Sequence, residues 1–344
     1  MSRRTVSVVV LAVLLVLLFW QLPEVPLLVF AAVLLGVFFY SGGTLLCRVV
    51  PVPHAAGVLV FILLLLLAGT GLALLAAAPI ADQLNELWQQ VPVAASRLTE
   101  RLSHYSWGRE ILEQFNPQNI SLPSGSGTVS AFSAINTTFG VLGNAVLVLF
   151  LGLYFAVDPG LYRRGIEAMV APSLRPRAHD VAIEAAHTLR GWLGAQLISM
   201  TVVGLLTALG LWLIGLPLAL VLGVIAGLLA FIPTIGPVMA AVPGVLLGLS
   251  DGLTGALSVA AVYLVVQTVE SYLVTPYVQR RSVDLPQAAT IVALVGFGLL
   301  FGFLGMLLAT PMAAVLLMLV NRLYVDDYLE REMVEEWRQP AIRR

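Results

Sequence analysis

The sequence predicts an all-α polytopic integral membrane protein whose spans are accompanied by re-entrant or Gly/Pro-broken segments. Charged residues make up 11% of the 344 residues, apolar residues make up 59%, and the mean hydropathy is +0.96. A soluble domain carries about 25% charged residues, so this chain could not cover a water-facing surface. The composition therefore excludes an ordinary soluble enzyme, a disordered chain and a secreted disulfide scaffold.

The inventory of reactive side chains narrows the function further. All 18 basic residues are arginine, and Cys47 is the one cysteine of the chain. A Walker A loop and a Schiff base both need lysine, and a disulfide or a Cys-based metal cluster within the chain needs more than one thiol. With a net charge of −1 and no basic face, the chain is not expected to bind nucleic acid. We expect no cofactor, no bound metal and no ATPase activity.

Residues 1–81 are predicted to form three transmembrane spans, read as the uncharged runs 5–20, 25–46 and 55–78. The first run follows two arginines, as in a signal peptide, but no small-x-small cleavage site comes after it, so we interpret it as a retained span. Residues 82–138 are expected to form an extracytoplasmic amphipathic helix and a loop, because apolar residues recur there at spacings of three and four.

The remainder divides by polarity. Residues 139–157 predict a further span, and 158–190 a charged cytoplasmic helical stretch that opens with an Asp158-Pro159 helix start. Residues 191–321 are predicted to be the transport core, and 322–344 a charged cytoplasmic tail. With the N-terminus inside, 15 arginines are cytoplasmic and three are not, which satisfies the positive-inside rule. We therefore expect a multi-pass protein of the inner (plasma) membrane with both termini in the cytoplasm.

The transport core contains prolines and glycines deep in apolar runs. Proline removes a backbone donor, glycine permits irregular backbone, and interrupted segments of this kind point to a transport site. Packing by small residues is the alternative interpretation, and it weighs equally for the glycine run of the last block. The interrupting residues singled out as pathway candidates are Pro233, Thr234, Gly236, Pro237, Gly302, Gly305 and Pro311.

Glu270 is the one acid inside an apolar run, about 15 Å from the cytoplasmic boundary if the chain stays helical as far as Arg280. A carboxylate at that depth is costly, so it should face a cavity or a partner. Gln267 shares its helix face, Ser271 adjoins it, and Pro276 should end or kink the helix. Glu270 is either a coupling or solute-binding carboxylate or a structural one held by Gln267 or Arg281.

Four segments in order, 231–237, 270–276, 285–286 and 302–311, resemble the autoinducer-2 exporter-like (AI-2E) family of permeases. The resemblance places Pro233, Gly236, Pro237, Glu270, Pro276 and Pro311 on family motif positions; Ser271 stands where many members have Asn. It implies about eight spans and a homo-oligomer, with a pentamer as one form. It also implies export of a furanose-type signal, or sodium(lithium)/proton antiport.

The leading functional prediction is a secondary transporter that exports a small polar metabolite or autoinducer-2-like signal. The alternatives are a sodium(lithium)/proton antiporter using Glu270, with proton or sodium as the coupled ion, and a non-transporting oligomeric scaffold in the lipid bilayer. An enzyme is not expected, because the chain has no HExxH motif. The predicted pathway residues are Glu270, Gln267, Ser271, Pro233, Thr234, Gly236, Pro237, Pro276, Arg281, Gly302, Gly305 and Pro311.

Overall fold

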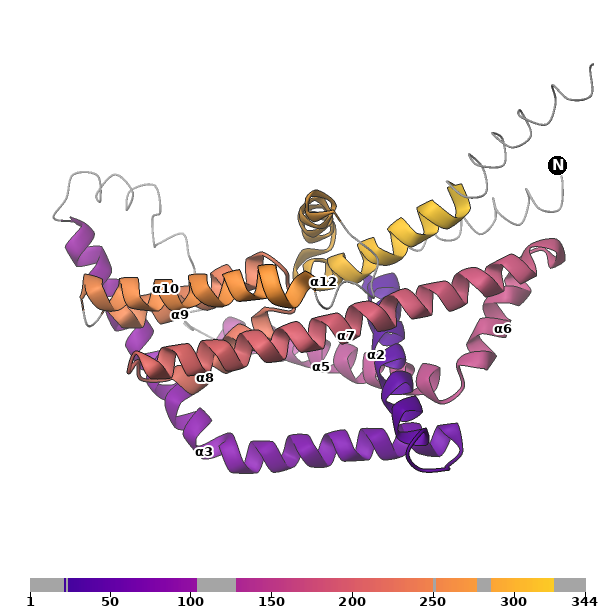
Figure 1. Cartoon of the computed structure of the whole chain (residues 1–344), viewed down its shortest axis with the longest axis horizontal. Helices are drawn as coiled ribbons and strands as arrows, with labels where there is room; N and C mark the ends of the chain where they lie inside the picture. Colours follow the sequence, from indigo (N-terminus) through magenta and orange to yellow (C-terminus); the bar gives the residue numbers. More distant parts are fainter. Residues whose placement is uncertain (1–21, 23, 104–127, 250–251, 277–285, 325–344) are drawn as a thin grey trace, which may run out of the picture. The chain divides into compact units, whose positions relative to one another are not determined.

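The computed structural model describes residues 22, 24–103, 128–249, 252–276 and 286–324, and all regular elements within these ranges are helices (Figure 1). The all-α prediction is confirmed for this part of the chain. The predicted first span 5–20, most of the loop after residue 103, the polar turn with Arg281 and the end of the tail lie outside the described residues. The chain divides into two compact units: residues 1–66, 144–195 and 279–344 form the first, and 67–143 and 196–278 the second.

In the first unit, three helices pack through small residues. α2 (Glu24–Cys47), the beginning of α3 (His54–Ser103) and the end of α5 (Thr128–Val157) bury Phe39, Val58 and Ala156 against one another. A Cβ atom on Gly36 would lie 3.1 Å from the Gly152 carbonyl oxygen. The two backbones therefore approach as closely as small residues allow, as is usual between membrane helices.

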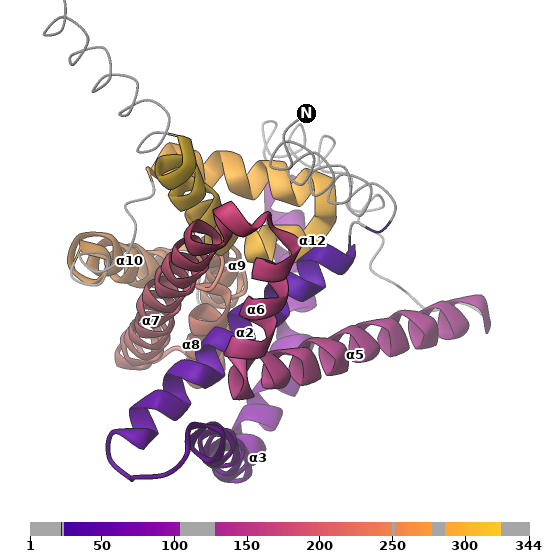
Figure 2. The same ribbon diagram turned by 90° about the vertical axis from the view of Figure 1, so that its right-hand side faces the viewer.

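The chain turns by 92° between α5 and α6 (Pro159–Met169) (Figure 2). Asp158 makes the corner, because its carboxylate accepts a hydrogen bond from the Leu161 N–H at 3.1 Å and Pro159 occupies the first turn of α6. The side chain satisfies one of the N–H groups that a helix start leaves free, and proline needs no partner there. The predicted helix start at Asp158-Pro159 is confirmed.

Charged side chains tie the ends of α6, α7 (Arg175–Leu213) and α12 (Gln287–Val320) together in the same unit. Glu167 lies 3.4 Å from Arg163 and 2.8 Å from the His179 ring nitrogen Nδ1. Arg322, just after α12, lies 3.4 Å from Glu184 on α7. His179 therefore has a carboxylate partner.

α12 is broken at Gly302, where φ is +64° and ψ is −148°, a conformation open almost only to glycine. An unbroken 34-residue helix would be about 51 Å long, well beyond the roughly 30 Å hydrocarbon core. The break leaves segments of about 22 Å and 27 Å. A Cβ atom on Gly305 would collide with the Phe297 carbonyl oxygen, so Gly305 allows the close approach of the two segments.

In the second unit, the rest of α7 is followed by two short helices, α8 (Ala219–Leu229) and α9 (Ile235–Gly248), and then by α10 (Leu253–Val269) with the π-helix η4 (Glu270–Val274). Gly215 at φ +76° and Leu218 at φ +66° make the turn into α8. At about 17 Å and 21 Å, α8 and α9 are each too short to cross the hydrocarbon core alone.

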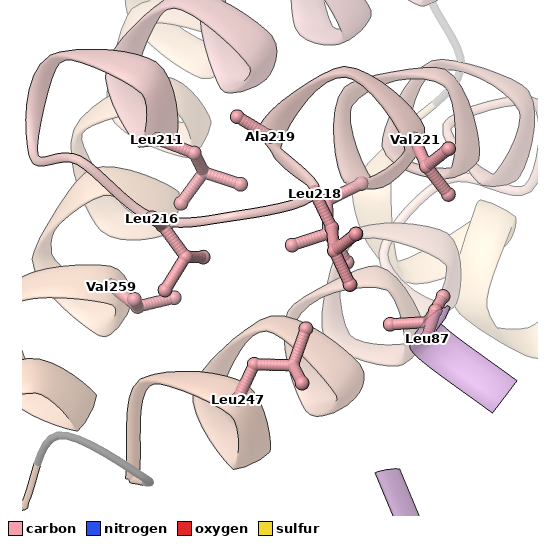
Figure 3. Close-up of a cluster of buried hydrophobic side chains, with 9 residues drawn as sticks. Leu87, Leu211, Leu216, Leu218, Ala219, Val221, Leu247 and Val259 are labelled. Atoms are coloured by element: carbon pink, nitrogen blue, oxygen red, sulfur yellow. The ribbon is translucent and has the colours of Figure 1, made fainter. Parts of the chain in front are cut away.

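The second unit is held by a cluster of aliphatic side chains from five helices and from the turn before α8, shown in Figure 3. Leu87, from the amphipathic part of α3, is one of them, and the Gln83 side chain of the same segment accepts a hydrogen bond from the Val221 N–H at 3.3 Å. Part of the predicted amphipathic stretch therefore packs on its own chain. The cluster consists of Leu87, Leu211, Leu216, Leu218, Ala219, Val221, Leu222, Leu247 and Val259.

Within the described residues, five helices are long and apolar enough to cross a membrane, or six if the bent pair α5–α6 counts as one span. The predicted boundaries at 81/82, 138/139 and 190/191 fall inside the continuous helices α3, α5 and α7. A change in polarity therefore marks a change of environment rather than a helix end.

Candidate functional site

The carboxylate of Glu270 is held by two neutral donors in the second unit. The Ser199 hydroxyl on α7 donates to Oε1 at 2.6 Å, and the Gln267 side-chain amide on α10 donates to Oε2 at 2.9 Å. All three side chains are partly buried. A carboxylate in an apolar helix is costly unless it is hydrogen-bonded, and both of its oxygens are. The contact with Gln267 is the one expected of a structural carboxylate, and the role of Glu270 in transport stays a prediction.

Glu270 begins the π-helical turn η4. The Thr275 N–H bonds to the Glu270 carbonyl, one residue further back than in an α-helix. Pro276 explains the wider turn, because its ring crowds the carbonyl four residues earlier and it has no N–H to give. Single π-turns in α-helices occur frequently at functional sites. The Gln267 amide also reaches the Ser271 hydroxyl at 3.5 Å, so Ser271 belongs to the same polar group.

One turn of α7 connects this carboxylate to the corner between α8 and α9. Gln196 lies three residues before Ser199, on the same face of α7, and its side-chain amide donates to the Ala230 carbonyl at 2.7 Å. Ala230 caps the C-terminal end of α8, where carbonyls lack helical partners. The corner and the carboxylate are therefore fixed by neighbouring positions on a single helix.

The corner itself has an irregular backbone. Thr234 sits at φ +69° and makes no side-chain cap to α9. A Cβ atom on Gly236 would collide with the Leu229 carbonyl oxygen, so glycine is required by space. Pro237 falls in the first turn of α9, where its missing N–H costs nothing. Pro233 directly precedes Thr234, the residue with positive φ. The predicted helix break at 231–237 is confirmed.

The pathway candidates therefore divide between the two units. Gly302, Gly305 and Pro311 belong to the first unit, where Gly302 breaks α12 and Pro311 is fully buried inside it. Arg281 lies outside the described residues. The candidates of the second unit, gathered around the carboxylate and the corner, are Glu270, Gln267, Ser271, Pro276, Pro233, Thr234, Gly236 and Pro237.

Sequence reasoning missed Ser199 and Gln196, the two contributions of α7. Both are polar residues within an uncharged block, three positions apart and so on one helix face. This spacing could have indicated a polar face on the helix. Only the antiparallel register of α7 and α10, however, identifies Glu270 as the partner of Ser199.

Two other kinds of site, a metal site and an apolar cavity, give weaker candidates for function. Among the described residues, no group of three or more His, Cys, Asp or Glu side chains could hold a metal ion. A cavity of about 490 Å³ lies in the second unit against Gln83, Trp212 and residues 216–220, at the far end of α7 from Ser199. Its lining is almost entirely apolar, and none of the predicted site residues lines it.

Comparison with known proteins identifies the family of the chain. Residues 9–324 match the family described as AI-2E family transporter. The chain is 24% identical to the "Putative transport protein YueF" of Bacillus subtilis (strain 168) over 258 residues, covering 71% of this chain and 69% of the relative. It is 25% identical to the "Putative transport protein YrrI" of the same organism over 272 residues, covering 77% of each. The chain is a multi-pass membrane protein and belongs to the AI-2E transporter family.

Proposed function

We propose that the chain is a secondary transporter that exports a small polar solute across the bacterial inner membrane, and that the Glu270 carboxylate with Ser199 and Gln267 binds the solute. Membership of a transporter family supports transport as the activity. The resemblance to the autoinducer-2 exporter-like proteins favours a neutral, hydroxyl-rich signal or metabolite as cargo. The arginine distribution favours cytoplasmic termini, and the distance of about 15 Å from Glu270 to the cytoplasmic boundary favours a site near the middle of the roughly 30 Å hydrocarbon core.

The observation that carries the proposal is the pair of hydrogen bonds that two neutral donors, Ser199 and Gln267, make to the Glu270 carboxylate. Each carboxylate oxygen has two acceptor sites, so each has a remaining lone pair after its contact with Ser199 or Gln267. A solute hydroxyl can donate to those lone pairs while the serine and the amide keep the carboxylate in place. The adjoining corner has a backbone that is free of regular helical pairing at Thr234, as expected beside a pathway.

The second candidate function is sodium(lithium)/proton antiport, and it uses the same carboxylate. Both contacts of Glu270 within the described residues are neutral, so a proton or a small cation could occupy the site without displacing a resident positive charge. In that case the carboxylate would be exchanged between its protonated and cation-bound forms. A non-transporting scaffold would need neither the protonated nor the cation-bound form of the Glu270 carboxylate.

The test is flux through the full chain reconstituted in proteoliposomes. The variant is Glu270→Gln, which keeps the shape and removes the charge. The matched control is Glu86→Gln on α3, an exposed acid that accepts a hydrogen bond from the Gln90 amide. Three readouts separate the candidates: efflux of autoinducer-2, a proton flux started by sodium or lithium, and the assembled fraction by size-exclusion chromatography.

We expect transport by Glu270→Gln to fall by about a hundredfold, as for the loss of a charged hydrogen-bond acceptor worth about 3 kcal/mol, while Glu86→Gln transports normally. Loss of solute efflux with no sodium-dependent proton flux supports export, and the reverse supports antiport. Undiminished transport by an assembled Glu270→Gln protein would refute the role of the carboxylate. Absence of any flux, with function lost only on deletion of 82–138, would favour the scaffold.

A further inference from the structure

Two buried hydroxyl groups in the second unit have no hydrogen-bond partner among the described residues. They are the Thr207 hydroxyl on α7 and the Tyr263 hydroxyl on α10. Thr207 is 0% exposed. A buried polar group without a partner costs free energy, and native proteins contain few of them. Neither hydroxyl group is accounted for by the packing of the fold or by the Glu270 site.

The Thr207 hydroxyl is exceptional for a helical threonine. Thr201 on α7 and Thr268 on α10 both donate to the carbonyl four residues earlier, at 2.7 Å. This local bond is the usual way in which a threonine satisfies itself inside a helix. Thr207 makes no such bond, although it lies deeper in the protein than either of them. Its hydroxyl is therefore left available to something other than its own backbone.

The packing places Thr207 and Tyr263 at the same level of the α7–α10 contact. The two helices run antiparallel, because Ser199 bonds to Glu270 at one end, and a Cβ atom on Gly210 would lie 2.6 Å from Val262 at the other. Interpolation between these contacts puts Thr207 opposite the turn that contains Tyr263. Both residues are in the second unit, so one local packing arrangement holds them.

The neighbours of Thr207 and Tyr263 also indicate that the two residues lie at the same height along the contact between α7 and α10. Tyr263 packs against two separate apolar clusters: one contains Leu211 and Val259, and the other contains Val203 and Val266. Thr207 is one helical turn from Val203 and one turn from Leu211, so it lies between the same two clusters. A third wall comes from α9, where a Cβ atom on Gly244 would lie 3.0 Å from the Tyr263 hydroxyl oxygen.

The same helix faces lead to the Glu270 carboxylate. On α10, Tyr263, Gln267 and Glu270 are spaced four and three residues apart and so share a face. On α7, Ser199 and Thr207 are eight residues apart, with Val203 between them. Along the contact between α7 and α10, one apolar layer thus separates two polar levels: the level of Glu270 and the level of Thr207 and Tyr263. A purely structural membrane interface needs no such levels, because small and apolar residues suffice.

We infer that Thr207 and Tyr263 form a second hydrogen-bonding station for a neutral hydroxyl group, located between α7, α9 and α10 on the path to Glu270. The inference rests on the proposed transport function. A tyrosine hydroxyl and a threonine hydroxyl can each donate and accept, so together they suit a hydroxyl-bearing partner. They do not suit an ion, which would be left without a counter-charge in this apolar surrounding. The partner hydroxyl belongs either to water or to the transported solute.

The first test measures whether Thr207 is reached from water. In the full chain, Cys47 is replaced by serine to remove the native thiol, and Thr207→Cys or Ala156→Cys is added. Ala156, on α5, is equally buried at 0% exposure but lies within the separate apolar cluster of Phe39 and Val58. The probe is 2-aminoethyl methanethiosulfonate, applied to membranes. We expect Thr207→Cys to react about tenfold faster or more, which corresponds to ~1.4 kcal/mol.

Added ribose identifies the source of the partner hydroxyl. Slower labelling of Thr207→Cys in ribose indicates a solute hydroxyl, and unchanged labelling indicates water; both outcomes support the station. Equal labelling of the two cysteines would overturn it. Transport by Glu270→Gln is measured on a different variant with a different readout, so a failure of the proposed function is distinguishable from a failure of the station.

A second test needs no cysteine and applies even if Thr207→Cys does not fold. Tyr263→Phe removes one hydroxyl and keeps the ring, with Tyr272→Phe, 77% exposed, as its control. A hydroxyl with a bound partner stabilises the fold, so we expect Tyr263→Phe to lower the melting temperature by about 2 °C relative to the control. A hydroxyl without a partner is a cost, and in that case the temperature would stay the same or rise, which would overturn the station.

Discussion

The glycine at the corner between α8 and α9 gives the sharpest stability prediction. Replacing Gly236 by alanine places a methyl group against the Leu229 carbonyl oxygen, at a separation that real atoms do not adopt. The obstructing atom belongs to the backbone, so no side chain can rotate away. Leu229 also accepts the Ile232 N–H at 3.0 Å, and the displaced carbonyl would lose that bond.

The cost follows from these two terms. Overpacking of a close contact costs about 1–3 kcal/mol, and a lost hydrogen bond about 1 kcal/mol, which gives roughly 3 kcal/mol in all. A compact unit of this size loses about 2–4 °C of melting temperature for each kcal/mol, so Gly236→Ala should melt roughly 6–12 °C lower. The measurement is thermal unfolding in detergent, followed by the fluorescence of the six tryptophans.

Gly194→Ala is the matched control. Gly194 lies in α7, and a Cβ atom there meets nothing within 4 Å. The exchange should leave the melting temperature unchanged or raise it, since alanine favours a helix over glycine by about 1 kcal/mol. If Gly236→Ala melts within the error of Gly194→Ala, the corner does not have the tight geometry that the pathway argument requires.

Three further substitutions test other parts of the fold. Asp158→Ala removes the N-cap of α6 and should destabilise the protein by about 1 kcal/mol, whereas Asp158→Ser should recover most of the loss in thermal unfolding; equal losses would exclude the cap. Gly302→Ala forces a side chain into φ +64°, ψ −148° and should cost about 1–3 kcal/mol by the same assay; a neutral result would mean that α12 is not broken there. Gln83→Leu removes the acceptor from the first turn of α8, so amide hydrogen exchange at Val221 should accelerate about fivefold or more, whereas Gln90→Leu on the same helix should leave it unchanged; unchanged exchange in Gln83→Leu would refute the cap.

Features with a local physical cause could be predicted from the sequence. The corner at 231–237 follows from two prolines and a glycine within seven residues, and the break at Gly302 from a glycine-rich run. The corner at Asp158 follows from a capping side chain next to a proline. Glu270 could be found because one acid in an apolar run has a large desolvation cost wherever it packs. Each of these predictions needs only neighbours in the chain.

Features that depend on packing could not be predicted. The change to charged residues after residue 81 suggests a boundary, yet α3 continues to Ser103 through Pro79 and Pro92, because a helix can pass from lipid into water without ending. The partners of Glu270 depend on the antiparallel register of α7 and α10, which is set by contacts such as Gly210 against Val262. The sequence shows the polarity of Ser199 but not what it faces.

The π-turn at Glu270 shifts the face that α10 presents to α7. In a regular α-helix, positions three and four residues beyond Glu270 would continue its face toward α7. The extra residue in the turn rotates the next residues of the helix by about 100°. Leu273 is accordingly 65% exposed, whereas Val266, four residues before Glu270, is 6% exposed. Glu270 therefore lies where this face shifts, and Val274 and Thr275 beyond it are again partly buried.

In the proposed function, the two polar levels have different roles. The carboxylate lies at the π-turn, where the face of α10 shifts, so we expect a solute to meet it before entering the contact between the helices. Thr207 and Tyr263 lie further in, beyond the layer of Val203 and Val266, and a group can reach them only when that layer separates. Substitution at Glu270 should therefore act first on solute affinity, whereas the loss of the inner hydroxyls should act on the rate of passage.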